Sequence, residues 1–251
     1  MSFKKLFRAL MCMLCALLFV LNSRGPQRAA AEGAPEAPAA PVPSAAQLSA
    51  AYRRMRAQKP AIDIRLPEYA LYGAGHPVGE LFFETQRVAG VPVDARIAPD
   101  LRALLAAARE KGLNVYLSCG YIDPVAAEHV YRRTVEKVGE FRARVLVDRP
   151  GENEHESGLA VDITDRYYEE KDESLEDTEL FTWLKLHSCD YGFILRYPKD
   201  KKEITGHVYQ PWHFRYVGVE AAVFITENHL TLEEFLDLYR VDVPSSPISP
   251  A

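Results

Sequence analysis

Cysteine and tryptophan are scarce in this chain of 251 residues, which contains four cysteines and two tryptophans. Two of the cysteines lie near the N-terminus, and the other two, Cys119 and Cys189, are too few for a disulfide framework. We expect both to be buried thiols rather than bridge partners or nucleophiles. The chain also lacks a basic cluster that could follow a nucleic-acid backbone, and its net charge is -5, so nucleic acid is not an expected partner.

A long membrane-spanning run is missing as well. The N-terminal apolar run, Ala9 to Leu21, has 13 residues, whereas a membrane-spanning helix needs about 20. Three basic residues precede this run, as in a secretory signal, and Ala29 to Ala31 offer a small-residue cleavage site. An uncleaved anchor is the alternative. In both cases we expect an exported chain whose domain lies outside the membrane, free in the extracellular space, at the cell wall or anchored.

Composition divides the chain into four parts. Residues 1–31 are expected to be the signal or anchor, and 32–46, rich in proline and alanine, an extended linker. Residues 47–243 have the length and composition of one globular domain, and 244–251 form a Pro/Ser tail. We expect the domain to be a monomer that meets the membrane only through an uncleaved N-terminal segment.

Helical and extended patterns alternate without a regular βαβ rhythm, which predicts an α+β fold with a small antiparallel sheet flanked by helices. Asp123 is the expected N-cap of one helix, and Thr231 with Glu234 forms a capping box for another. The predicted helices are 99–111, 124–138, 175–189 and 232–240, and the predicted strands are 114–118, 192–196, 212–217 and one that begins after Gly158.

The segment 150–165, PGENEHESGLAVDITD, contains the first candidate metal ligands. After Gly158, apolar residues alternate with Ala160, Asp162 and Thr164, so one face of the strand carries an acid beside a small neighbour. An inward-facing carboxylate needs a compensating charge, and a cation would supply it. His155, which the turn brings towards Asp162, completes a pair suited to zinc, although an ordinary salt bridge explains this segment equally well.

The segment 203–218, EITGHVYQPWHFRYVG, supplies a third candidate. Trp212, Phe214 and Tyr216 occupy one side of a predicted strand, and His213 and Arg215 the other. Three protein ligands with an open fourth position are typical of a catalytic zinc site. The other histidines have no such context, and they are His76, His129, His187, His207 and His229.

The order of these motifs resembles the VanY-type D-alanyl-D-alanine carboxypeptidases, within the lysostaphin, D-Ala-D-Ala metallopeptidase and hedgehog group. It runs S-x-G-Y, H-x-x-G-x-A-x-D, G-F-x-x-R-Y-P and P-W-H-x-R-Y-V-G, over roughly residues 88–218. The resemblance implies a small α+β domain with zinc on the sheet face. It implies zinc ligands at His155, Asp162 and His213. Its implied substrate is a peptidoglycan stem peptide that ends in D-Ala-D-Ala.

The chain departs from this family at the position of the general base. The family's last motif is usually Glu-x-Trp-His, and Gln210 replaces that glutamate. Glutamine hydrogen-bonds water but cannot accept its proton, and a missing base typically costs about 10²–10⁴ in rate. Glu154 or Glu156, beside His155, is a candidate substitute, although each acid taken singly also fits a solvated loop.

The resemblance also implies substrate-binding residues, which are Ser118, Tyr121, Arg196 and Trp212. The family's S-G-Y-R-S motif reads Cys119-Gly120-Tyr121-Ile122-Asp123 here, so Ile122 replaces its substrate-contacting arginine. Arg196 could pair with a substrate carboxylate, with Asp162, or within a structural ion pair.

These features favour a zinc-dependent D-alanyl-D-alanine carboxypeptidase that trims stem peptides, with activity reduced by Gln210. The alternatives are a zinc-containing module that binds cell-wall peptides without cleaving them, and another peptidoglycan peptidase, either an L,D-carboxypeptidase or an endopeptidase. Release of D-Ala from a stem pentapeptide separates the carboxypeptidase from the binding module.

Overall fold

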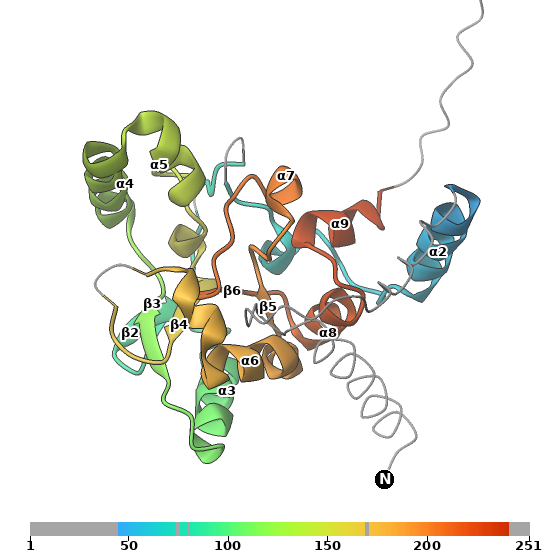
Figure 1. Cartoon of the computed structure of the whole chain (residues 1–251), viewed down its shortest axis with the longest axis horizontal. Coiled ribbons are helices and arrows are strands. Elements are labelled where there is room, and N and C mark those ends of the chain that lie inside the picture. The colour runs from blue at the N-terminus through green and yellow to red at the C-terminus, as the bar shows by residue number, and fades with distance from the viewer. Residues whose placement is uncertain (1–44, 74–75, 80, 169–170, 241–251) are drawn as a thin grey trace, which may run out of the picture. The chain divides into compact units, whose positions relative to one another are not determined.

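The computed structural model describes residues 45–240, apart from 74–75, 80 and 169–170 (Figure 1). The expected signal or anchor, most of the expected linker and the C-terminal tail lie outside the described residues. The described part of the expected linker region is Ala45 and Ala46. These two residues begin helix α2 (Ala45–Gln58). Among the described helices, none combines the length and the apolar character that a membrane crossing needs.

A four-stranded sheet in the order β3-β4-β6-β5 lies at the centre, and each neighbouring pair is antiparallel. The strands are β3 (Tyr116–Cys119), β4 (Ala160–Thr164), β5 (Phe193–Leu195) and β6 (His213–Tyr216). The predicted α+β class with a small antiparallel sheet is confirmed. A separate hairpin, β1 (Thr85–Val88) and β2 (Val91–Asp94), was not predicted, because β1 exposes three of its four residues and shows no apolar alternation.

Helices connect and cover these strands. The α-helices after α2 are α3 (Ala98–Glu110), α4 (Pro124–Val138), α5 (Glu140–Leu146), α6 (Glu179–His187), α7 (Lys202–Thr205), α8 (Val219–Glu227) and α9 (Leu232–Asp237). Short 3-10 helices are η1 (Pro67–Tyr69), η2 (Glu154–Ser157), η3 (Glu173–Asp177) and η4 (Ser188–Tyr191). The helices α4 and α5 lie side by side (Figure 1).

The predicted caps are present, but one predicted helix is divided. Asp123 accepts a hydrogen bond from the backbone N–H of Ala126, and Thr231 and Glu234 form the reciprocal capping box. The predicted helix 175–189 instead becomes η3, α6 and η4. Thr178 has extended backbone angles and caps the N–H of Phe181, so α6 begins only at Glu179.

The two faces of the sheet have different roles. Val161 and Ile163 of β4, with Phe214 of β6, pack into a core that includes apolar residues of α3 and α6, and Figure 1 shows both helices on one side of the sheet. Since side chains alternate along a strand, Asp162 and His213 project from the opposite face. This alternation leaves the chemistry-bearing residues together on the face away from that core.

Gly158 links η2 to β4 and adopts the left-handed conformation, with φ +71. A Cβ there would lie 2.7 Å from Phe83 Cε2 and 3.0 Å from the backbone nitrogen of Asp94. Gly206 has φ +77, and a Cβ added to it would meet nothing within 4 Å, which makes it a matched control. We expect Gly158→Ala to lower the free energy of unfolding by about 1–3 kcal/mol more than Gly206→Ala does, because only the former is overpacked. Urea denaturation of both variants measures the difference, and equal losses would contradict it.

Candidate metal centre

The three predicted metal ligands come together on the polar face of the sheet. Asp162 of β4 lies directly opposite His213 of β6 in the strand register. His155, in η2, reaches the same place because Gly158 turns the chain from η2 into β4. The Asp162 Oδ1 atom lies 3.3 Å from His155 Nε2 and 3.3 Å from His213 Nδ1. Two imidazole nitrogens therefore face one carboxylate oxygen.

Asp162 has the properties of a ligand for a cation. Its side chain is almost fully buried, and Oδ1 has no hydrogen-bond partner within the described structure. The other oxygen, Oδ2, accepts a hydrogen bond from Lys171 Nζ at 2.6 Å. Burial opposes ionisation, but the ammonium charge of Lys171 holds the pKa of Asp162 well below its usual value. A buried carboxylate oxygen without a donor, flanked by two imidazoles, fits a zinc ion.

Hydrogen bonds on the far side of each imidazole fix its orientation. His155 Nδ1 lies 2.8 Å from the carbonyl oxygen of Gly120, which can only accept, so Nδ1 carries the proton. His213 Nε2 lies 3.1 Å from Glu154 Oε2 and donates to that carboxylate. These bonds leave His155 Nε2 and His213 Nδ1 as the unprotonated nitrogens that face Asp162. Such outer contacts set the tautomer of metal-binding histidines.

Glu154 is fully buried, so the interpretation of this acid as part of a solvated loop is wrong. Its Oε1 accepts hydrogen bonds from Arg196 Nε at 2.7 Å and Arg215 Nη1 at 3.0 Å. Burial would raise the pKa of Glu154, but the two guanidinium groups hold it well below its usual value. With Oε2 bound to His213, both carboxylate oxygens orient neighbours on the metal face.

Arg196 does not pair with Asp162, which corrects one of the expected partnerships. Its Nη1 and Nη2 donate to Glu233 of α9, at 3.0 and 2.6 Å, while Nε donates to Glu154. The side chain is only 1% exposed. Arg196 is therefore a structural ion-pair residue. Its Nε, Nη1 and Nη2 atoms already donate to carboxylates of the chain, so they are not free for a substrate carboxylate.

Gln210 lies three residues before His213 and is held close to it through the backbone. The His213 N–H donates to the Gln210 carbonyl at 3.2 Å, and the Gln210 N–H donates to the carbonyl of Tyr197 at 3.1 Å. The side chain is buried, and its Nε2 donates to the carbonyl of Leu146 at 3.4 Å, at the end of α5. The amide thus has a protein partner that a carboxylate could not keep.

Glu156, the second acid beside His155, is also buried. Its Oε1 accepts a hydrogen bond from the Gly151 N–H at 2.7 Å. Burial is the main reason that the pKa of Glu156 is raised above its usual value, and nearby carboxylates add to the effect. Asn153 caps this turn, since its Oδ1 accepts from the His155 N–H at 2.9 Å. The turn that holds His155 is therefore fixed at both ends.

The remaining predicted substrate residues lie around the end of β3 and in the segment before β6. Ser118 Oγ donates to the backbone carbonyl of Asp162 at 3.3 Å, so this side chain supports the metal strand. Tyr121 packs edge-on against Phe83, with ring centroids 5.3 Å apart. Trp212 is partly exposed beside His213. Ser118 and Tyr121 stay half-buried near the sheet edge, which leaves them partly accessible.

Three residues near the site were missed by the sequence analysis. Lys171 and Glu233 come from segments with no motif, and only their contacts with Asp162 and Arg196 reveal them. Cys119, expected to be a buried thiol without a role, is half-buried instead. Among the described residues, the ligand atoms of Cys119, His155 and Asp162 all lie within 4.8 Å of one another. The position of Cys119 in the family's S-G-Y motif was the available signal.

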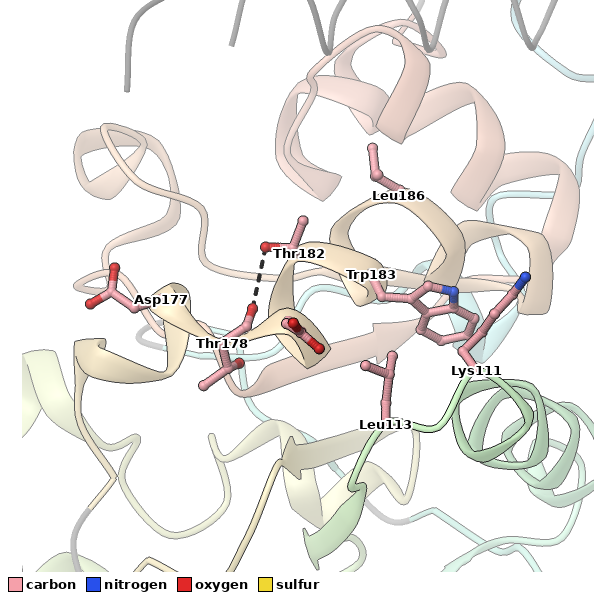
Figure 2. A pocket seen from close by; sticks show the side chains of 8 residues that line it. Lys111, Leu113, Asp177, Thr178, Thr182, Trp183 and Leu186 are labelled. Carbon is pink, nitrogen blue, oxygen red and sulfur yellow. Dashed lines mark hydrogen bonds between the residues drawn. The ribbon is translucent and has the colours of Figure 1, made fainter. Parts of the chain in front are cut away.

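A surface cavity of about 360 Å³ lies elsewhere, between the start of α6 and the loop after α3. Figure 2 shows Trp183 and Leu113 lining it, with the Thr182 hydroxyl donating to the Thr178 carbonyl at 3.2 Å. None of the candidate metal ligands lines this cavity. It therefore belongs to a different part of the surface from the metal face.

A family model described as VanY: D-alanyl-D-alanine carboxypeptidase matches residues 91–219. A D-alanyl-D-alanine carboxypeptidase of Enterococcus faecalis (strain ATCC 700802 / V583) is 38% identical over 159 residues, which cover 59% of this chain and 57% of that protein. The bifunctional D-Ala-D-Ala dipeptidase and carboxypeptidase VanXYC of Enterococcus gallinarum is 36% identical over 127 residues, 49% of this chain and 67% of that protein. The matched regions cover 52%, 57% and 67% of the length of three curated relatives and 28% of a fourth, so the chain matches only part of these proteins.

Solved structures agree with this similarity. VanYB in complex with D-alanine-D-alanine has a TM-score of 0.63 and 33% identity, covering 69% of this chain and 99% of that one. A glutamate-to-alanine variant of the vancomycin resistance D,D-pentapeptidase VanY, in complex with Zn(II), has a TM-score of 0.62 and 34% identity, with coverages of 68% and 99%. The LD-carboxypeptidase LdcB has a TM-score of 0.55 and 36% identity, with coverages of 64% and 75%.

Proposed function

Since the chain belongs to the VanY family of D-alanyl-D-alanine carboxypeptidases, we propose that it is a zinc-dependent enzyme that removes the terminal D-Ala from peptidoglycan stem peptides. The observation that carries this proposal is the buried Asp162 Oδ1, which has no hydrogen-bond partner and faces one nitrogen from each of His155 and His213. Two imidazoles and one carboxylate are a ligand set typical of catalytic zinc, which keeps a further position for water or substrate.

A bound zinc ion would supply a Lewis acid that polarises the scissile carbonyl and lowers the pKa of water. The residues of the chain prepare the place for this chemistry. The Gly120 carbonyl and Glu154 hold the two imidazoles in their metal-binding tautomers, and Arg196 and Arg215 keep Glu154 ionised. Gln210 can hold a water molecule by a hydrogen bond but cannot take its proton.

The proton acceptor in this proposal is Glu156 or bulk solvent rather than Glu154. Both oxygens of Glu154 are already engaged by Arg196, Arg215 and His213. Glu156 has one oxygen bound to the Gly151 N–H and leaves the other with lone pairs for a proton. Loss of hydrolysis in Glu156→Ala at saturating zinc, with native zinc affinity, tests this assignment. Unchanged hydrolysis in this variant would leave solvent as the acceptor.

We propose that the domain acts outside the membrane, where stem peptides are found. The N-terminal pattern of basic residues followed by an apolar run supports export. Protease accessibility of the domain in intact cells distinguishes an exported chain from a retained one.

The purified protein, loaded with zinc, is expected to release D-Ala from a stem pentapeptide that ends in D-Ala-D-Ala. EDTA should stop the release, and added zinc should restore it, because all three ligand side chains are protein groups that remain in place. A coupled assay for free D-Ala measures both effects. D-Ala release that EDTA does not affect would count against the metal centre.

Two other functions have support from particular observations. The match to an LD-carboxypeptidase favours cleavage of a tetrapeptide, in which D-Ala follows an L-centre, and the same assay with that substrate tests it. Gln210 and Ile122 favour a module that binds cell-wall peptides without cleaving them. Tight pentapeptide binding with no D-Ala release from either substrate would support the binding module.

A further inference from the structure

A β-bulge in β3 brings Cys119 onto the metal face. Tyr116 pairs with Thr164 and Leu117 with Ile163, and a regular ladder would then place Ser118 opposite Asp162. The register instead shifts between Leu117 and Cys119, and Cys119 is the residue opposite Asp162. A bulge of this kind adds one residue to one strand and redirects the side chains that follow it.

The pairings of β3, β4 and β6 therefore form one row across three strands. Cys119 is opposite Asp162, and Asp162 is opposite His213. Residues directly opposite on neighbouring strands share a face and have their Cβ atoms about 4.5–5.5 Å apart. The thiol, the carboxylate and the imidazole consequently project from the same side of the sheet.

The thiol of Cys119 lies beside the side-chain atoms that would bind the metal ion. The ligand atoms of Cys119, His155 and Asp162 lie within 4.8 Å of one another, and His213 Nδ1 meets the same Asp162 oxygen at 3.3 Å. The buried Asp162 Oδ1, which lacks a hydrogen-bond donor, is a second and independent sign that this point receives a cation. Cys119 Sγ donates a weak hydrogen bond to the carbonyl of Gly120 at 3.6 Å, which a metal ion can displace.

We propose that Cys119 is a fourth ligand of the metal held by His155, Asp162 and His213, an inference that rests on the proposed zinc centre. A thiolate is a strong zinc ligand, and a site with four protein ligands is closed. The thiol proton is released to solvent when the metal binds, as in other thiolate sites. In the resting protein, water and substrate must then compete with Cys119 for the metal.

This ligand set makes the centre selective for thiophilic divalent cations. Zn²⁺ and Co²⁺ accept mixed nitrogen, oxygen and sulfur ligands in tetrahedral geometry, whereas Mg²⁺ prefers oxygen alone. The alternative is a free thiol that packs beside the site and donates weakly to the Gly120 carbonyl. The two descriptions differ in whether sulfur bonds to the metal, which spectroscopy detects directly.

The test is a Co²⁺ titration of the full chain, with Cys12→Ser and Cys15→Ser introduced so that the two N-terminal thiols cannot bind cobalt. Visible d–d bands report that Co²⁺ occupies a tetrahedral site, and an intense near-ultraviolet band reports sulfur-to-cobalt charge transfer. We expect both signals. Cys119→Ser should lose the near-ultraviolet band and keep visible bands, whereas the matched control Cys189→Ser, at a thiol buried in the core around α8, should keep both.

The outcomes separate this inference from the function on which it rests. Visible bands without the near-ultraviolet band overturn Cys119 ligation and leave the three-ligand centre intact. A near-ultraviolet band that survives Cys119→Ser also overturns the assignment. The absence of any cobalt spectrum overturns the metal centre itself and the fourth ligand with it.

Discussion

The Gln210→Glu variant is expected to release D-Ala at least about 10²-fold faster than the native chain, because it restores a proton acceptor beside the reacting water. Gln210 lies three residues before His213, and its carbonyl accepts the His213 N–H, so the side chain starts from a fixed place beside a ligand. A carboxylate cannot donate to the Leu146 carbonyl as the amide does. Without that bond, the glutamate side chain is free to rotate towards the reacting water. Steady-state rates with the stem pentapeptide measure the change.

The same variant should bind zinc as the native chain does, because none of the three ligands is altered. Gln210→Ala is the matched control, since it removes the bond to Leu146 without adding a base. We expect Gln210→Ala to stay at or below the native rate. Equal rates in the glutamate, alanine and native chains would show that residue 210 takes no part in proton transfer, and would favour solvent or Glu156.

The Glu154→Gln variant is expected to lose roughly 3–5 kcal/mol of the free energy of unfolding, because two buried arginines lose the charge that compensates them. Arg196 and Arg215 are 1% and 0% exposed, and Glu154 Oε1 lies between their guanidinium groups. The amide NH₂ group of the glutamine would also face one of the three groups that donate to Glu154, which are Arg196, Arg215 and His213, and two donors cannot bond to each other. Urea unfolding of the metal-free protein measures this loss.

The variant should also bind zinc about 10–100-fold more weakly, since His213 loses the carboxylate that fixes its tautomer. Glu233→Gln is the control, because Glu233 contacts Arg196 from the other side, is 20% exposed and does not touch His213. Zinc titration of both variants separates a general loss of charge from a specific effect on His213. Native-like zinc affinity in Glu154→Gln would remove its role in orienting the ligand.

The sequence allowed the metal face to be predicted because its signals are local. Val161 and Ile163 alternate with Asp162, and Phe214 alternates with His213, so period-two patterning alone assigns the acid and the imidazole to one face. Gly158 marks the turn that brings His155 towards that face. Each of these signals is contained within a few residues.

Other features depend on contacts between distant segments and could not be predicted. The buried carboxylate of Glu154 is compensated by Arg196 and Arg215, which lie 42 and 61 residues away in sequence. The position of Cys119 opposite Asp162 depends on a bulge. No residue type in β3 predicts this one-residue shift of register. A regular count from Tyr116 would have assigned Ser118 to the row that contains Asp162.

The position of Lys171 bears on whether the chain can fold before it binds a metal. Its ammonium group lies 2.6 Å from Asp162 Oδ2, so the buried aspartate has a positive neighbour that belongs to the chain itself. The imidazoles of His155 and His213 are likewise oriented by a carbonyl and a carboxylate of the chain. The architecture of the site thus needs no ion as a template, and the metal can enter after the chain has folded.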